Sequence, residues 1–170
     1  HKEYRRQRQM CIRDRAQANA AAAFNKDGFE LFNNRTYVFL GDGCMQEGVA
    51  SEAASMAGHL GLKNLIAFYD DNHITIDGDT NCAFTEDVGK RFESYNWNVL
   101  TVKNGDEDLS ALWDAIVKAQ QEKERPTLVC VQTTIGFGSL NQGKASVHGA
   151  PLKEDCLLYT SPSPRDGLLS

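Results

Sequence analysis

The amino-acid sequence predicts an α/β protein built on a doubly wound parallel sheet. Two observations support this prediction. Short runs of β-branched and aromatic residues alternate along the chain with segments whose apolar residues recur every three or four positions, the period of an amphipathic helix. Tight-turn sequences follow the first of these runs directly. Strands and helices that alternate in this way build a parallel sheet with helices on both faces.

The first half of the chain contains a predicted helix, two strands and a helix between the strands. Residues 16–24 are rich in alanine, the best helix former, and this helix is expected to end near the breaker cluster 25–28. Residues 36–40 and 64–69 are the two expected strands. Apolar residues spaced by three and four predict that the helix between them buries one stripe: Val49, Ala53, Met56, Ala57 and Leu60.

The second half continues the alternation. Thr85 is the expected N-cap of a short helix, and the acids at 106–108 precede a longer one, where the helix dipole favours negative charge. The apolar stripe of the longer helix is predicted to be Leu109, Leu112, Ile116 and Ala119. The expected elements are, in order, a helix ending near 91–92, a strand at 97–102, a helix to about Gln121, a strand at 127–132 and a glycine-rich loop at 133–139.

The turn after the first strand and the loop after the second predict a metal and phosphate site. Gly41-Asp42-Gly43 follows the first strand, and Asn72 follows the second. In a parallel βαβ unit both positions lie at the carboxyl edge of the sheet, where ligands bind. The two glycines have no Cβ, so we expect a sharp turn and a close approach of the backbone to a ligand. Asp42 would repel a bare diphosphate, and a divalent cation between them removes the conflict. Magnesium and calcium accept carboxylate and amide oxygens as ligands, so either is the expected metal.

Other interpretations of these residues fit less well. A nicotinamide-binding fingerprint requires a third glycine where Gln46 stands. The run that begins at Asp77 resembles a calcium loop, but Cys82 replaces its glycine and Val88 its bidentate glutamate, so a polar turn is favoured. An isolated Gly-Asp-Gly would most simply be a turn in which the aspartate bonds its own backbone.

Composition narrows the class of protein further. Residues 16–155, between the outer segments 1–15 and 156–170, contain eleven basic and twenty acidic residues. This negative net charge argues against a nucleic-acid partner. The apolar runs are too short to cross a membrane, and no secretion signal is evident. Five cysteines, odd in number and at least 26 residues apart, fit neither a zinc site nor a disulfide framework, so a reducing compartment is expected. Cys44 is interpreted as a small buried residue, with a reactive thiol as the alternative.

Three stretches of sequence resemble the transketolase family: Gln46-Glu47-Gly48, residues 51–78 and residues 146–152. The resemblance covers about residues 16–155. It implies the thiamine-diphosphate-binding fold and transfer of a two-carbon ketol unit between sugar phosphates, in the pentose phosphate pathway or the Calvin cycle. It also implies thiamine diphosphate and a metal as cofactors, and a homodimer. A related ketol transferase such as dihydroxyacetone synthase, or a non-catalytic homologue, stays open, whereas deoxyxylulose-phosphate synthase fits poorly. The compartment is expected to be cytoplasmic, with the plastid stroma as alternative.

The resemblance also assigns roles to particular residues. Asp42, Asn72 and the backbone carbonyl of Ile74 match the metal ligands, and Gly41 and Gly43 belong to the motif that contacts the diphosphate. His148 matches a histidine that contacts cofactor phosphate and substrate, and is the candidate catalytic residue. Glu47 and Glu52 match acids at a subunit interface, although either could simply favour the first turn of a helix.

The resemblance divides the chain into three parts. Residues 16–155 are expected to be a fragment of the diphosphate-binding domain. Residues 1–15 and 156–170 depart from the family pattern and are expected to be foreign sequence or disordered tails. The pyrimidine-binding domain with its activating glutamate and the C-terminal domain have no counterpart in these residues, so the chain alone is expected to be inactive.

Overall fold

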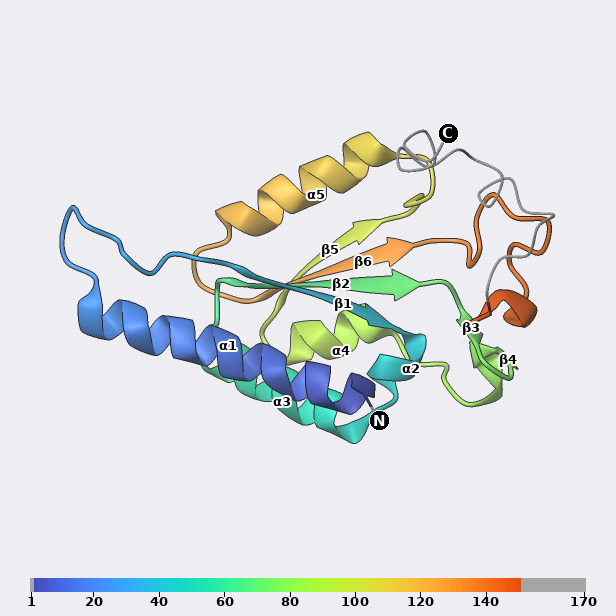
Figure 1. The fold of residues 1–170 in the computed structure, drawn as a ribbon, viewed down its shortest axis with the longest axis horizontal. Helices are drawn as coiled ribbons and strands as arrows, with labels where there is room; N and C mark the ends of the chain where they lie inside the picture. Colours follow the sequence, from blue (N-terminus) through green and yellow to red (C-terminus); the bar gives the residue numbers. More distant parts are fainter. Residues whose placement is uncertain (1, 151–170) are drawn as a thin grey trace, which may run out of the picture.

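The computed structural model describes residues 2–150 and shows a parallel four-stranded sheet between layers of helices (Figure 1). The strand order is β1-β2-β6-β5, and every neighbouring pair is parallel. The predicted α/β class and parallel sheet are therefore confirmed. The strands are β1 (Thr36–Gly41), β2 (Leu65–Asp71), β5 (Asn98–Val102) and β6 (Thr127–Gln132).

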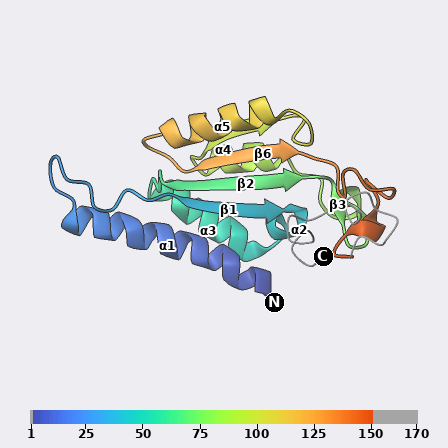
Figure 2. The ribbon, with the colours of Figure 1, turned by 45° about the horizontal axis from the view of Figure 1, so that its top comes forward.

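Helices cover both faces of the sheet. One face carries α1, α3 and α4, and the other carries α5 (Figure 1); Figure 2 shows α1 and α3 on the side of the sheet opposite α5. The helices are α1 (Lys2–Phe24), α2 (Asp42–Met45), α3 (Gly48–His59), α4 (Val88–Ser94) and α5 (Leu109–Gln121). Beyond the carboxyl ends of the strands lie a small hairpin, β3 (Ile74–Thr75) with β4 (Gly78–Asp79), and two 3₁₀ helices, Thr80–Cys82 and Ala145–Val147. Among the described residues, no helix is both long and apolar enough to cross a lipid bilayer.

The central strands are almost wholly apolar because helices cover them on both sides. Residues 65–69 of β2 and 127–131 of β6 are buried without the alternation of a half-exposed strand. The register pairs Gly41 with Asp70 and Asp71 with Gln132, so β1, β2 and β6 end at one edge. The loops that were predicted to form the site therefore leave the sheet side by side.

The buried stripe of α3 differs from the prediction. Met56 and Leu60 are largely exposed, and the fully buried positions of this helix are Ala54, Ala57 and Gly58. The reason is close packing: a Cβ at Gly58 would overlap the carbonyl oxygen of Tyr95 at the end of α4. Position 58 therefore has no room for a side chain, and the buried residues of α3 are all small.

The N-caps of the later helices lie close to the predicted positions. Asp87, not Thr85, caps α4, and its side chain accepts a hydrogen bond from the Lys90 N–H at 3.0 Å. Asp108 caps α5 by accepting from Ala111 N–H at 2.8 Å. At the first helical position of α5, Leu109 is 70% exposed, so it does not belong to the buried stripe that was predicted.

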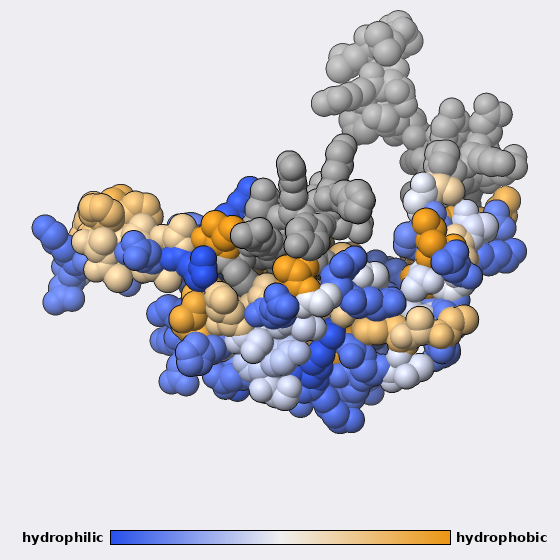
Figure 3. Space-filling model, turned by 90° about the horizontal axis from the view of Figure 1, so that it is seen from below, coloured by the Kyte–Doolittle hydropathy of each residue, from blue (hydrophilic) through white to orange (hydrophobic). Residues whose placement is uncertain are grey.

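Part of the α5 face of the sheet is not covered by the described helices. Phe39 on β1 is 81% exposed and stacks on the buried Phe68 of β2, with ring centroids 5.3 Å apart. Apolar side chains are also exposed in the loop that follows α1, at the left of Figure 3, where Phe29 and Leu31 are among the exposed residues. The described part of the chain thus presents apolar surface at two separate places.

The N-terminal segment is helical, contrary to its exclusion from the fold. No glycine or proline interrupts residues 2–24, and α1 is continuous from Lys2 to Phe24, which confirms the predicted end of the helix. That residues 1–15 are foreign sequence stays a prediction. The predicted tail 156–170 and the last residues of the expected domain lie outside the described residues.

Candidate functional site

Asp42 lies in a buried position directly after β1. Asp42 is 3% exposed and is the first residue of the four-residue α2. The longer α3 begins at Gly48. The Tyr69 hydroxyl on β2 donates to Asp42 Oδ1 at 2.5 Å. Asp42 Oδ2 is buried and has no hydrogen-bond partner among the described residues. A buried carboxylate oxygen without a donor is costly, so this atom marks a place for a further group.

The surroundings of Asp42 are acidic. Burial raises the pKa of its carboxyl, and the nearby Asp71 and Asp70 raise it further, whereas the Tyr69 hydrogen bond and His73 lower it. Burial, together with the contact to Asp42, also raises the pKa of the Tyr69 phenol, which therefore stays protonated and remains a donor. A cation at Asp42 Oδ2 would relieve the local excess of negative charge.

Asn72 lies on the turn between β2 and β3, and Ile74 is the first residue of β3. Asn72 Nδ2 donates to Asp70 Oδ2 at 3.1 Å, and the Ile74 N–H donates to Asn72 Oδ1 at 3.0 Å. Between them His73 has a positive φ of 59°, which turns the chain back toward α2. Cα atoms of α2 and β3 approach within 8 Å of each other. The structure therefore places the turns of Asp42 and Ile74 beside each other, although the hydrogen bonds of Asp42 and Asn72 go to other residues.

These residues fit a hard cation. One carboxylate oxygen, one amide oxygen and one backbone carbonyl are a suitable partial set of ligands for magnesium or calcium. Among the side chains that the structure describes, no group of three or more His, Cys, Asp and Glu is arranged to hold a metal. The predicted set contains only one such side chain, so it is not tested by that finding.

The glycines beside Asp42 do not adopt a left-handed backbone. Gly41 has an extended backbone with φ −115°, so the turn does not require the left-handed conformation that favours glycine. A Cβ added at Gly41 or Gly43 would meet nothing within 4 Å. The space beside both residues is open, and a close approach of ligand to this backbone stays a prediction.

The remaining predicted residues are exposed. His148 follows the 3₁₀ helix Ala145–Val147, and its N–H donates to Ala145 O at 2.9 Å. This segment lies beyond the carboxyl ends of the strands, near the β3–β4 hairpin (Figures 1 and 2). Glu47 is the N-cap residue of α3, and Glu52 lies one turn later on the same helix. Their exposure leaves all three side chains available for contacts with other groups.

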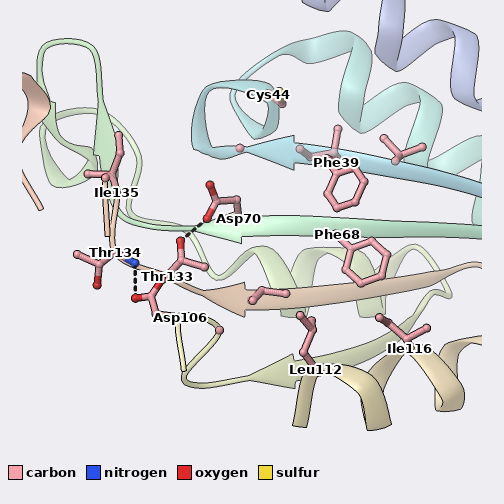
Figure 4. A pocket seen from close by; sticks show the side chains of 16 residues that line it. Phe39, Cys44, Phe68, Asp70, Asp106, Leu112, Ile116, Thr133, Thr134 and Ile135 are labelled. Carbon is pink, nitrogen blue, oxygen red and sulfur yellow. Dashed lines mark hydrogen bonds between the residues drawn. The ribbon is translucent and has the colours of Figure 1, made fainter. Parts of the chain in front are cut away.

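A cavity of about 800 Å³ opens between the exposed part of the sheet and α5 (Figure 4). Phe39, Phe68, Leu112 and Ile116 form its apolar side. Its polar end lies at the carboxyl edge of the sheet and is lined by Gly41, Asp70, Asp106, Thr133 and Thr134. A large apolar cavity with a few convergent polar groups is the usual form of a cofactor site.

Several polar residues of this edge were not predicted from the sequence. The Thr133 hydroxyl donates to Asp70 Oδ1, and the Thr134 N–H donates to Asp106 Oδ2 at 2.9 Å (Figure 4). Tyr69 had been assigned only to the strand. The acidic pair Asp70-Asp71 directly before Asn72 was the sequence feature that could have indicated these residues. Its hydrogen-bond partners depend on the strand register and could not be deduced from the sequence.

The family described as transketolase, thiamine diphosphate binding domain, matches residues 9–161 of the chain. The chain belongs to this family. The transketolase resemblance and the thiamine-diphosphate-binding fold inferred from sequence are thereby confirmed, and the predicted doubly wound sheet is the sheet of this family.

Known transketolases match most of this chain. It is 63% identical to Transketolase 1 of Saccharomyces cerevisiae over 140 residues, which is 82% of this chain and 21% of that protein. The solved transketolase of Pichia stipitis in complex with sedoheptulose 7-phosphate matches with a TM-score of 0.84 and 55% identity, over 87% of this chain and 22% of that one. The transketolase of Leishmania mexicana matches with a TM-score of 0.82 and 46% identity, over 86% and 22%. The chain spans about a fifth of the length of its curated transketolase relatives.

Proposed function

We propose that this chain supplies the metal and diphosphate part of the active site of a transketolase, which transfers a two-carbon ketol unit from a ketose phosphate to an aldose phosphate. The observation that carries the proposal is the unpartnered Oδ2 of Asp42. This atom is buried at the carboxyl edge of a parallel sheet, in a chain whose family binds thiamine diphosphate. Ligands of α/β proteins bind at that edge.

Three residues would hold the metal, and two would face the diphosphate. Asp42 Oδ2, Asn72 Oδ1 and the Ile74 carbonyl are the proposed ligands of magnesium or calcium. The open space beside Gly41 and Gly43 allows backbone groups to approach phosphate oxygens. Tyr69 holds the other oxygen of Asp42 and so orients the carboxylate. When bound, thiamine diphosphate supplies the nucleophilic carbon and the electron sink of the reaction.

His148 is the proposed substrate-contacting residue. It lies on an exposed segment beyond the carboxyl edge of the sheet, where a sugar phosphate could reach it. Solved relatives from Pichia stipitis are complexes with sedoheptulose 7-phosphate, xylulose 5-phosphate and fructose 6-phosphate. These complexes support sugar phosphates as the substrate class. The proposed setting is the pentose phosphate pathway or the Calvin cycle, in the cytoplasm or the plastid stroma.

The complete enzyme is proposed to be a homodimer. Glu47 and Glu52 lie exposed at the start of α3, where they are free to form contacts across a subunit interface. The exposed Phe39 and the apolar loop after α1 are proposed contact surfaces for other parts of the longer polypeptide.

The test is cofactor binding by the full-length enzyme with Asp42→Ala. We expect this variant to lose magnesium-dependent binding of thiamine diphosphate, measured by titration calorimetry, and to lose ketol transfer. The stability of the cofactor-free protein should not fall, because the substitution removes a buried carboxylate with an unpartnered oxygen. Asp77→Ala is the matched control, since Asp77 is an exposed acid on the neighbouring turn. Unchanged cofactor affinity in Asp42→Ala would contradict the assignment.

A further inference from the structure

Asp70, at the end of β2, binds two neighbours at once. Its Oδ1 accepts a hydrogen bond from the Thr133 hydroxyl at the end of β6 (Figure 4). Its Oδ2 accepts from Asn72 Nδ2 at 3.1 Å. Asp70 itself has no place in the proposed set of metal ligands.

The contact with Asp70 determines which way the Asn72 amide faces. A carboxylate accepts hydrogen bonds, so it holds the NH₂ group of the amide, and Asn72 Oδ1 must then point the other way. There Oδ1 accepts from the Ile74 N–H at 3.0 Å. The reversed amide would place an oxygen against the Asp70 carboxylate and an NH₂ group against the Ile74 N–H, which is unfavourable at both ends. An amide oxygen has two lone pairs, so Oδ1 keeps one for a cation.

We propose that Asp70 is a positioning residue for the metal site: it fixes the Asn72 amide so that Oδ1, and not Nδ2, faces the metal. The proposal rests on the proposed function, because Asn72 is a ligand only if the site binds a metal. A hydrogen bond from outside the ligand set to a ligand orients the ligand, and its loss weakens metal binding by about 10- to 100-fold in known sites.

A purely structural role is the competing explanation. Through the Thr133 hydroxyl, Asp70 also connects β2 to the loop after β6, and the neighbouring Asp71 O accepts from the Thr133 N–H at 3.3 Å. If Asp70 acted through this loop, removal of the Thr133 hydroxyl would weaken metal binding as much as a change of Asp70 itself. The two branches from Asp70 can therefore be separated by substitution.

The experiment measures Mn²⁺ and Mg²⁺ affinity at saturating thiamine diphosphate in the full-length enzyme, by titration calorimetry. Asp70→Asn keeps the shape of the side chain but can face Asn72 with either group. We expect a loss of about 10- to 100-fold in metal affinity. Thr133→Val removes only the hydrogen bond between Asp70 and the loop after β6. The metal affinity of this variant should stay within about threefold of wild type.

The double variant Asp70→Asn with Asn72→Asp supplies the rescue. The amide that it introduces at position 70 can donate to a carboxylate at position 72, which again presents only oxygens to the metal. This variant should bind metal more tightly than Asp70→Asn alone.

Three results would overturn the inference. They are wild-type metal affinity in Asp70→Asn, an equal loss in Thr133→Val, and a double variant no better than the single. Absence of metal-dependent cofactor binding in the wild-type enzyme is a different outcome, because it would overturn the proposed function and the inference with it.

Discussion

Asp14 on α1 is a buried carboxylate that should destabilise the chain at neutral pH. The residue is 1% exposed, and its Oδ1 has no hydrogen-bond partner among the described residues. Burial raises the pKa of its carboxyl from 3.8 to about 6, although a hydrogen bond from the Thr36 side chain opposes the rise. Such a rise is equivalent to about 3 kcal/mol, which we reduce to about 1–2 kcal/mol because a folded chain relaxes around a buried charge.

The sign of the pH dependence follows from this raised pKa. Below about pH 4 the carboxyl is protonated in both the folded and the unfolded chain, so burial carries no charge penalty. Between about pH 4 and pH 6 the unfolded chain loses its proton first, and the free energy of unfolding falls as pH rises. Above about pH 6 the loss is complete. Asp14→Asn keeps the shape without the ionisation, so this variant should lack that fall and be about 1–2 kcal/mol more stable at pH 7.5.

Urea unfolding of the 170-residue chain, followed by circular dichroism from pH 4 to pH 8, measures this difference. Other acids titrate in the same range, so the informative quantity is the difference between wild type and Asp14→Asn at each pH. Asp14→Ala serves as a second variant and should be at least as stable, since alanine is also the better helix former. Parallel curves for wild type and Asp14→Asn, with no convergence toward pH 4, would refute the reasoning.

Four further predictions follow from packing and from the proposed site. Gly58→Ala should lower the free energy of unfolding by about 3 kcal/mol or more, measured by urea denaturation, because its Cβ would overlap the Tyr95 carbonyl; an unchanged midpoint would contradict this. Arg91→Lys should cost about 1–3 kcal/mol, because one ammonium cannot replace a guanidinium that donates to Met45 O at 3.0 Å and also contacts Ser51 and Glu86. A double-mutant cycle with Glu86→Gln would reveal if the ion pair alone accounts for that loss. His148→Ala in the full-length enzyme should lower kcat/KM by roughly 10- to 100-fold with little effect on stability, and wild-type kinetics would remove it from the site. The 170-residue chain alone should show no ketol transfer with thiamine diphosphate and magnesium, and turnover near that of the full-length enzyme would show that other residues carry the chemistry.

The strands could be predicted because burial on both faces leaves a simple signal. Residues 65–69 and 127–131 are apolar almost without interruption. The predicted ends of these two strands differ from the observed ends by no more than two residues. The buried face of α3 was less accessible to prediction, since hydrophobic periodicity treats Met56 and Ala57 as equivalent apolar residues. In the structure Ala57 is buried and Met56 is 46% exposed, and the close approach of Tyr95 at Gly58 shows that this face of the helix packs through small residues.

The location of the candidate site residues in turns could be predicted from the sequence. Their contacts with side chains of other strands could not. Asp42 and Asn72 follow strands, and a parallel topology is sufficient to bring their turns to one edge. The contacts of Tyr69 with Asp42 and of Asp70 with Thr133 depend on register and side-chain direction across strands distant in sequence. The spacing of residues along the sequence does not determine the strand register or the direction of a side chain.

Two buried carboxylate oxygens lack a partner among the described residues, and they have opposite interpretations. Asp42 lies at the carboxyl edge of the sheet, beside open backbone and a turn that offers further oxygens. Asp14 lies on a helix near Thr36, the first residue of β1, and so near the opposite edge. The proposed cation would share the first carboxylate with other ligands, whereas the second carboxylate accepts a hydrogen bond from the Thr36 side chain. The same physical cost therefore argues for a bound group at Asp42 and for a loss of stability at Asp14, which lies within the residues that match the family. Neutralising each residue separates the two cases, because Asp42→Asn should lose cofactor binding while Asp14→Asn should gain stability with cofactor binding unchanged.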